Sequence, residues 1–208
     1  MRVPDPASPG SIAADAALRQ NLPADPPCPD DVTAVLRSGV IVRFMGSTDG
    51  DPDVCVQHWN GRSYRYYLGF WGEGRFEHGT PNQRQALAAI LRGPVGAQTD
   101  VALRGPTVGK LWKSATVTHV ADTSLPVGHD KRPVVKIRVV RRDALGRDGV
   151  TAEELYWLDR VTGIPLRKGT VTRMADGQVS RITTWDVLAV RSGDADAATS
   201  DVGVGHVD

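Results

Sequence analysis

Hydrophobic and polar residues alternate along most of the chain with a period of two, which is typical of half-buried β-strands. The alternation is clearest in residues 133–141 and recurs in residues 40–44, 53–59, 62–70, 111–120, 152–159, 165–174 and 178–190, with 99–104 as a weaker candidate. Turn sequences such as Asn60-Gly61 and Asp176-Gly177 lie between neighbouring candidates. The pattern predicts about nine strands joined mostly by short turns, an antiparallel up-and-down meander.

Two segments carry helical signals instead. Residues 81–92 hold an apolar stripe between clear end signals, which are Thr80 and Pro81 before Leu87, Ile90 and Leu91, and Gly93-Pro94 after them. Residues 30–37 begin with two acids and are followed by Gly39, the polarity expected of a short helix. The sequence therefore predicts one main helix and one or two helical turns near the start of the domain.

A sheet of this many strands has to curl or split to bury its apolar face. We predict a single mainly β domain over residues 30–191, a half-barrel or barrel-like curved meander with the main helix packed on, or lidding, its concave face. Residues 1–29 and 192–208 are rich in small and polar residues without periodicity, and we expect a disordered or extended arm and a disordered tail.

The charge balance narrows the range of partners. The chain has 25 basic and 24 acidic residues, interspersed, whereas a dedicated nucleic-acid binder would carry a strong basic excess. No apolar run reaches the roughly 18–20 residues of a membrane span. The first residues as written, Met1 to Pro4, lack the apolar core of a signal peptide, so a trimmed signal and an upstream start both stay open.

The two cysteines, Cys28 and Cys55, allow two interpretations. They are either unrelated free thiols or a disulfide that ties the amino-terminal arm to a strand, and we favour the disulfide. Such a bond requires an oxidising compartment and would contribute about 3 kcal/mol by closing its loop. Because no Cys-x-x-Cys pair or Cys/His cluster is present, we expect no metal and no cofactor.

Aromatic residues concentrate between residues 64 and 76. These rings could pack in the core, or they could form the lip of an apolar pocket that the main helix helps to enclose. Trp71, in a Gly-rich stretch expected to be a loop, is the ring predicted to be exposed. The candidate ligand-binding residues are Tyr64, Tyr66, Phe70, Trp71, Phe76, His78, Leu87 and Leu91.

Candidate catalytic groups are few. We expect Asp159 to hydrogen-bond the backbone of its own turn, and His119 to be hydrogen-bonded on a strand. A catalytic alternative would place His58, His78 or His119 near Asp159 or Glu154. The histidines lack metal-site spacing.

Residues 105–110 resemble a phosphate loop only superficially, because the two glycines are one residue too close and Leu follows the lysine. A basic strand face over residues 136–142, which includes Arg141 and Arg142, is expected to be solvated or to guard a sheet edge. An anionic headgroup or an acidic partner is the alternative occupant of that face.

The segment from Tyr156 to Val190 contains an aromatic-Leu-Asp strand end, a Thr-Gly-hydrophobic-Pro turn at Thr162 to Pro165, and a strand that carries Arg167. It resembles the carboxy-terminal part of the LolA/LolB-like lipoprotein-carrier family. The resemblance implies an open half-barrel whose apolar concave face is lidded by a helix, and which holds acyl chains or binds partner proteins outside the cytoplasm.

Three functions are consistent with these patterns. The first is a non-enzymatic periplasmic or secreted protein that binds a lipid-like or apolar ligand, or a partner polypeptide, in the concave face of its sheet. The second is an envelope structural or regulatory module that docks a protein partner and has no ligand cavity. The third is a small hydrolase or isomerase in a barrel-like fold.

Overall fold

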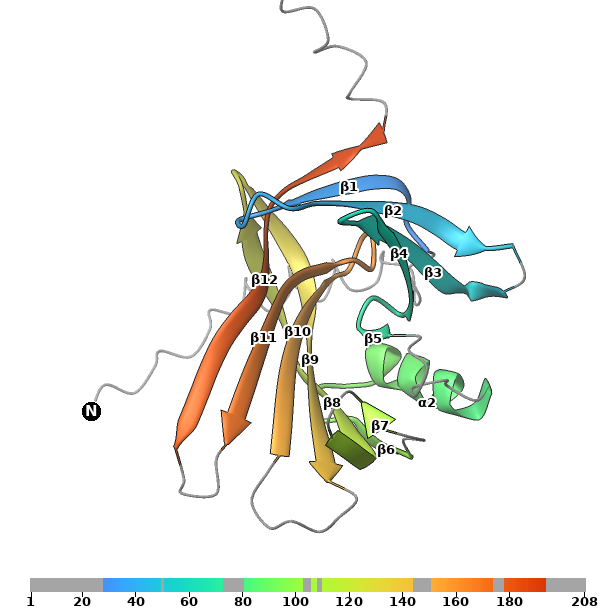
Figure 1. Ribbon diagram of the computed structural model, residues 1–208, viewed down its shortest axis with the longest axis vertical. Coiled ribbons are helices and arrows are strands. Elements are labelled where there is room, and N and C mark those ends of the chain that lie inside the picture. The colour runs from blue at the N-terminus through green and yellow to red at the C-terminus, as the bar shows by residue number, and fades with distance from the viewer. Residues whose placement is uncertain are drawn as a thin grey trace, which may run out of the picture.

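The computed structural model describes residues 28–49, 51–72, 81–102, 106–107, 110–143, 151–173 and 178–193. These residues form one curved antiparallel sheet and one helix, α2 (Pro81–Arg92) (Figure 1). The strands are β1 (Asp30–Leu36), β2 (Ile41–Thr48), β3 (Asp51–Trp59), β4 (Arg62–Tyr67), β5 (Trp71–Gly72), β6 (Gln98–Ala102), β7 (Pro106–Thr107), β8 (Lys110–Val127), β9 (Asp130–Asp143), β10 (Thr151–Asp159), β11 (Pro165–Arg173) and β12 (Val179–Ser192).

The strand order is that of two meanders joined side by side. Along the sheet it runs β5-β4-β3-β2-β1-β12-β11-β10-β9-β8-β6, and β7 pairs with β8 outside this path. Every pairing is antiparallel, and the sheet does not close on itself. The two meanders meet where β1 pairs with β12, for example Ala34 beside Val190. The predicted mainly β, antiparallel, curved sheet with one main helix is thus confirmed.

The helix α2 follows one edge strand of the sheet, β5, and precedes the other, β6. In Figure 1 it lies beside both of them, next to β8. Leu87, Ile90 and Leu91 are buried in one cluster with Val117 and with Ile137 of β9. The helix is therefore packed on the sheet by its predicted apolar stripe.

The predicted helix at residues 30–37 is wrong, because this segment is strand β1. Val32, Ala34 and Leu36 are buried and the residues between them are not, which is the period of a strand. Pairing with β2 on one side and β12 on the other supplies backbone hydrogen bonds that a local reading cannot foresee.

Other elements are longer or more numerous than expected. The described residues form twelve strands rather than nine. The strand predicted over residues 111–120 continues to Val127, and residues 71–72 of the expected loop pair with β4. The hairpin at Asn60-Gly61 is as predicted, since φ is positive at both residues (50° and 71°) and matches the twist of adjoining strands.

The interior divides into two apolar clusters. One lies between α2, β5 and the strands β8 to β10, and the other between β1 to β4 and residues of β8, β9, β11 and β12. Gly69 joins the two halves: its φ is +77°, and a Cβ atom there would lie 2.0 Å from the carbonyl oxygen of Gly163. Only glycine therefore fits where the β4–β5 turn rests on the β10–β11 turn.

Cys28 and Cys55 are joined by the expected disulfide, with Cα atoms 5.1 Å apart. It ties the residues before β1 to β3, across 27 positions of sequence. The helix of the described part of the chain is too short to cross a membrane. Thr80, Phe76 and His78 lie outside the described residues, as does the sequence from 144 to 150.

Candidate binding groove

A groove of about 670 Å³ lies between the β3–β4 hairpin and strands β10 to β12. Its walls come from both meanders, and none of its lining residues belongs to α2. Its lining residues are Gln57, Trp59, Ser63, Tyr64, Arg65, Tyr66, Gly69, Phe70, Arg141, Glu154, Tyr156, Pro165, Lys168, Thr184 and Trp185.

Aromatic rings form much of the wall. Trp59 stacks on Tyr64 across the hairpin, with ring centroids 5.0 Å apart. The same indole packs perpendicular to that of Trp185 on β12, with ring centroids 6.5 Å apart, so the rings bridge the two meanders. The indole N–H of Trp185 donates to the carbonyl oxygen of Pro165 at 2.7 Å, which fixes the orientation of that ring. Ring contacts of this kind add to the apolar area that the side chains bury.

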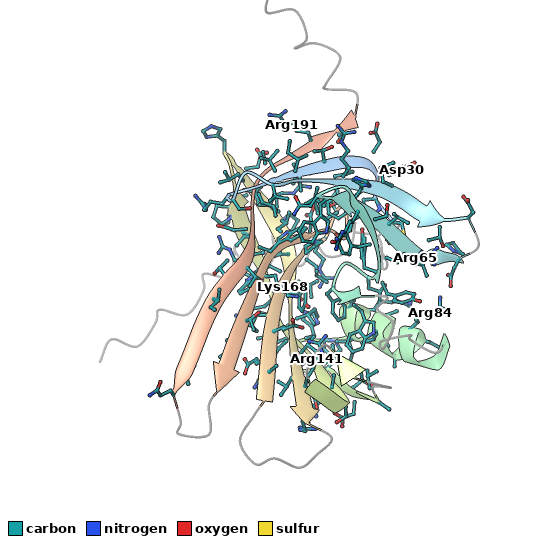
Figure 2. All side chains as sticks on the ribbon, in the orientation of Figure 1. Asp30, Arg65, Arg84, Arg141, Lys168 and Arg191 are labelled. Atoms are coloured by element: carbon teal, nitrogen blue, oxygen red, sulfur yellow. A yellow bond between two sulfur atoms is a disulfide. The ribbon has the colours of Figure 1, made fainter. Side chains whose placement is uncertain are left out.

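A small charged cluster stands on the opposite wall. Glu154 and Tyr156 are two positions apart on β10 and share one face, and the phenol donates to Glu154 Oε2 at 3.0 Å. Arg141 of β9 bonds the same carboxylate oxygen. Lys168 of β11 lies 3.1 Å from Oε1, with its ammonium 5.0 Å from the centre of the Tyr156 ring. Figure 2 shows Lys168 and Arg141 in this region and Arg65 on the other side.

The cluster keeps Glu154 ionised. Burial by itself would raise the pKa of this carboxyl group, but the charges of Arg141 and Lys168 and their hydrogen bonds outweigh it and lower the pKa from 4.5 to about 2. The carboxylate is therefore a fixed anion at neutral pH and is unsuited to act as a general base.

Two polar atoms of the wall are buried without a hydrogen-bond partner, the hydroxyl of Tyr66 and the indole nitrogen of Trp59. Tyr66 is 5% exposed, and burial raises the pKa of its phenol well above the usual range, so it remains a neutral donor. Buried polar groups are normally paired, and leaving one unpaired costs on the order of 1–3 kcal/mol. Both atoms belong to groove-lining residues.

The predicted ligand-binding residues fall into two groups. Tyr64, Tyr66 and Phe70 line the groove together. Trp71 is 1% exposed, so its predicted exposure is wrong: its ring lies in the core near Phe70, and the Arg141 guanidinium lies over it at 5.8 Å. Leu87 and Leu91 are core residues on the buried face of α2 and do not line this groove.

Sequence reasoning missed Trp59, Glu154, Tyr156, Lys168 and Trp185 as a group. Alternation within each strand could have placed Glu154 with Tyr156. The remaining neighbours depend on cross-strand register, such as Lys168 beside Trp185, and on the curl of the sheet. Arg141 was predicted on an outer basic face with Arg138, but it bonds Glu154 in the groove, whereas Arg138 pairs with Glu153.

Asp159 is buried in the β10–β11 turn and holds it together, as predicted. The Thr162 hydroxyl donates to its carboxylate at 2.6 Å and the Val161 N–H at 3.4 Å. Arg132 Nη2 adds an ion pair at 2.5 Å that the sequence did not indicate. The β10–β11 turn, which leads into Pro165 of the groove lining, is thus held by a carboxylate whose hydrogen bonds are satisfied.

His119 is fully buried and bonded at both ring nitrogens. Nδ1 lies 3.0 Å from the carbonyl oxygen of Gly93, after α2, and Nε2 lies 3.2 Å from Asp122 Oδ1. Arg160 bonds the same carboxylate and the carbonyl oxygen of Leu91. This cluster fastens the end of α2 to β8, and its bonds give His119 a structural role.

His58 is exposed on β3, and its Nδ1 lies 3.4 Å from the Ser63 hydroxyl. In the described residues, neither His58 nor His119 bonds Asp159 or Glu154, the acids of the catalytic alternative. No group of three or more His, Cys, Asp or Glu side chains in this part of the chain is placed to hold a metal ion.

No protein family and no curated protein matches the chain. Among solved structures, it is similar to the crystal structure of the hypothetical lipoprotein YmcC from Escherichia coli K12, at 14% sequence identity and a TM-score of 0.42. The alignment covers 89% of this chain and 100% of the other. The likeness is a weak one at the level of the fold.

Proposed function

We propose that this protein is a non-enzymatic binding protein that holds a partly apolar ligand in the groove between the β3–β4 hairpin and β10 to β12. The observation that carries the proposal is the contrast within the concavity: α2 fills one part with side chains, whereas the groove stays open with aromatic walls. Its volume of about 670 Å³ is that of a pocket for a small organic molecule, which such pockets surround with apolar and aromatic groups.

The alternatives receive less support from the same geometry. A docking module without a ligand cavity would have Tyr64, Tyr66 and Trp185 packed together, but these rings border open volume. A hydrolase or isomerase that used Glu154 would need this carboxylate to be free to act as a base. Glu154 is instead occupied by two cations and a phenol.

The disulfide supports a site of action outside the cytoplasm. Bonds of this kind form and persist in oxidising compartments and are rare where glutathione keeps thiols reduced. The bond between Cys28 and Cys55 also anchors β3, which carries Trp59 of the groove wall. We therefore propose a periplasmic or secreted location for the binding protein.

The proposal is tested by titrating the purified protein with single-chain amphiphiles and following tryptophan fluorescence and heat of binding. Trp185→Phe removes an indole from the groove. Trp157→Phe is the matched control, because Trp157 is the neighbour of Tyr156 on β10 and points to the other face, where Lys136 lies over its ring at 4.9 Å.

We expect saturable binding by the native protein, weakened several-fold by Trp185→Phe and unchanged by Trp157→Phe. Mass spectrometry of an organic extract of the protein, purified without detergent, adds a search for a copurifying ligand. Failure of every amphiphile to bind, together with an extract that contains no small molecule, would contradict the proposal.

A further inference from the structure

The charged cluster of Arg141, Lys168 and Glu154 on one wall of the groove holds more positive than negative charge. Glu154 is shared by Arg141 and Lys168, so one carboxylate faces two cations. Among the described residues that line the groove, Glu154 is the only acid, whereas Arg65 also belongs to the lining. Cations in a partly dehydrated site attract an anion, because each charge is poorly solvated there.

Lys168 is placed to receive that anion. Its side chain is 33% exposed, compared with 11% for Arg141, so it is the more accessible of the two. The ammonium group of Lys168 has three N–H donors, and one of them reaches Glu154. The same ammonium group lies over the Tyr156 ring. Donor capacity therefore remains on the groove side.

The facing wall offers neutral donors beside apolar surface. The Trp59 indole N–H and the Tyr66 hydroxyl are buried and unpaired, and both belong to the lining. An acceptor oxygen of a ligand would satisfy them and remove the cost of leaving them unpaired. The stacked rings of Trp59 and Tyr64 next to them suit a hydrocarbon chain.

We infer that the ligand is an anionic amphiphile, whose carboxylate or phosphate group binds at Lys168 while its hydrocarbon part lies against the rings of Trp59, Tyr64 and Trp185. This inference rests on the proposed function and specifies its ligand class. It assigns to Lys168 the recognition of the head group, and to the aromatic wall the recognition of the chain.

The experiment compares four probes by calorimetry at one ionic strength: dodecyl phosphate, dodecanoate, dodecanol and inorganic phosphate. Each is titrated into the native protein, into Lys168→Met and into Lys136→Met, at concentrations below micelle formation. Lys136 is the matched control because its ammonium also lies over an aromatic ring, that of Trp157, on the other face of the sheet. Thermal unfolding of both variants verifies that they fold.

We expect both anionic amphiphiles to bind the native protein about tenfold or more tightly than dodecanol, because a hydrogen bond between two charged groups is stronger than one to a neutral hydroxyl. Lys168→Met should reduce that ratio towards one, and Lys136→Met should preserve it. Inorganic phosphate should bind far more weakly than dodecyl phosphate.

Equal binding of dodecanol and the anionic amphiphiles would overturn the inference and leave the proposed function standing. Inorganic phosphate that binds as tightly as dodecyl phosphate would also overturn it, because the site would then be one for a free anion. An equal loss in Lys136→Met would show that Lys168 has no special role. If dodecyl phosphate, dodecanoate and dodecanol all fail to bind, the proposed function itself is refuted.

Discussion

The two parts of the concave face share strands β9 and β10, but different kinds of side chain line them. Beneath α2, aliphatic side chains interlock, and Leu87, Val117 and Ile137 are all completely buried. Beneath the β3–β4 hairpin, rings and charged groups stand around open volume. The hairpin contributes rigid, flat side chains that stack on one another, such as Trp59 on Tyr64, and these cannot fill an irregular space as the helix does.

The difference extends to polar groups. At the helix side, His119 bonds at both ring nitrogens, and Asp122 and Arg160 complete that cluster. At the groove side, two buried donors have no partner in the described protein. In the cluster around His119 the protein itself supplies the hydrogen-bond partners, whereas the groove retains a free-energy cost that a bound molecule can offset. Separate effects of mutation on stability and on binding would sharpen this comparison.

The largest expected effect is on stability at the helix side. Leu87→Ala removes a side chain that is 0% exposed, and we expect it to lower the free energy of unfolding by about 4 kcal/mol, within the range for cavity-forming substitutions. Urea denaturation measures the change. Gln85→Ala, on the exposed face of the same helix, is the control and should alter stability by less than about 0.5 kcal/mol. A small loss in Leu87→Ala would mean that this side is not a packed core.

The sequence predicts most of this packed side and little of the groove. The apolar stripe of α2 and the alternation in residues 133–141 are local patterns, and so is the Asn60-Gly61 turn. The strand β1 is not, because its edges are satisfied by β2 and by β12, which lies more than 140 residues away. From its local sequence, a short run of acids and small apolar residues, β1 is predicted to be a helix. Only its pairing with β2 and β12 makes it a strand.

The groove requires still more than pairing. Tyr64 and Tyr66 can be placed on one face by alternation, but Trp59 meets Trp185 only because the sheet curls and brings β3 towards β12. Trp71 stands in a Gly-rich stretch that reads as an exposed loop. It is buried because the Arg141 guanidinium lies over its ring and it packs into the core beneath α2, and both contacts come from residues distant in sequence. Curvature and long-range contact thus determine the site, and alternation does not encode them.

A smaller effect, which depends on pH, is expected at the charged wall. The pKa of Glu154 is lower in the folded protein, about 2, than its usual value of 4.5, so the folded state binds fewer protons than the unfolded state between these values. The stabilisation is complete above pH 4.5 and is lost as the pH falls towards 2. Its magnitude is about 3 kcal/mol.

The measurement is the free energy of unfolding from pH 7 to pH 2, for the native protein and for Glu154→Gln. Because other acids titrate in both proteins, their contribution cancels in the difference. We expect that difference to shrink as the pH falls below 4.5. The matched control is Glu153→Gln. It removes a carboxylate that lies on the same strand as Glu154 and pairs with Arg138 of β9. A difference that is independent of pH would mean that Glu154 is not held ionised by its two cations.

The smallest effect on stability, and the most direct test of the contrast, comes from two tyrosines. Tyr66→Phe removes a buried hydroxyl that has no partner. We therefore expect the free energy of unfolding to rise or fall by less than about 1 kcal/mol. Tyr156→Phe removes a hydroxyl that donates to Glu154 at 3.0 Å, and we expect a loss of about 1–2 kcal/mol. Both variants keep the ring, so packing is matched. If Tyr66→Phe is the more destabilising of the two, the Tyr66 hydroxyl is satisfied within the folded protein, and the groove does not hold it as an unpaired donor for a ligand.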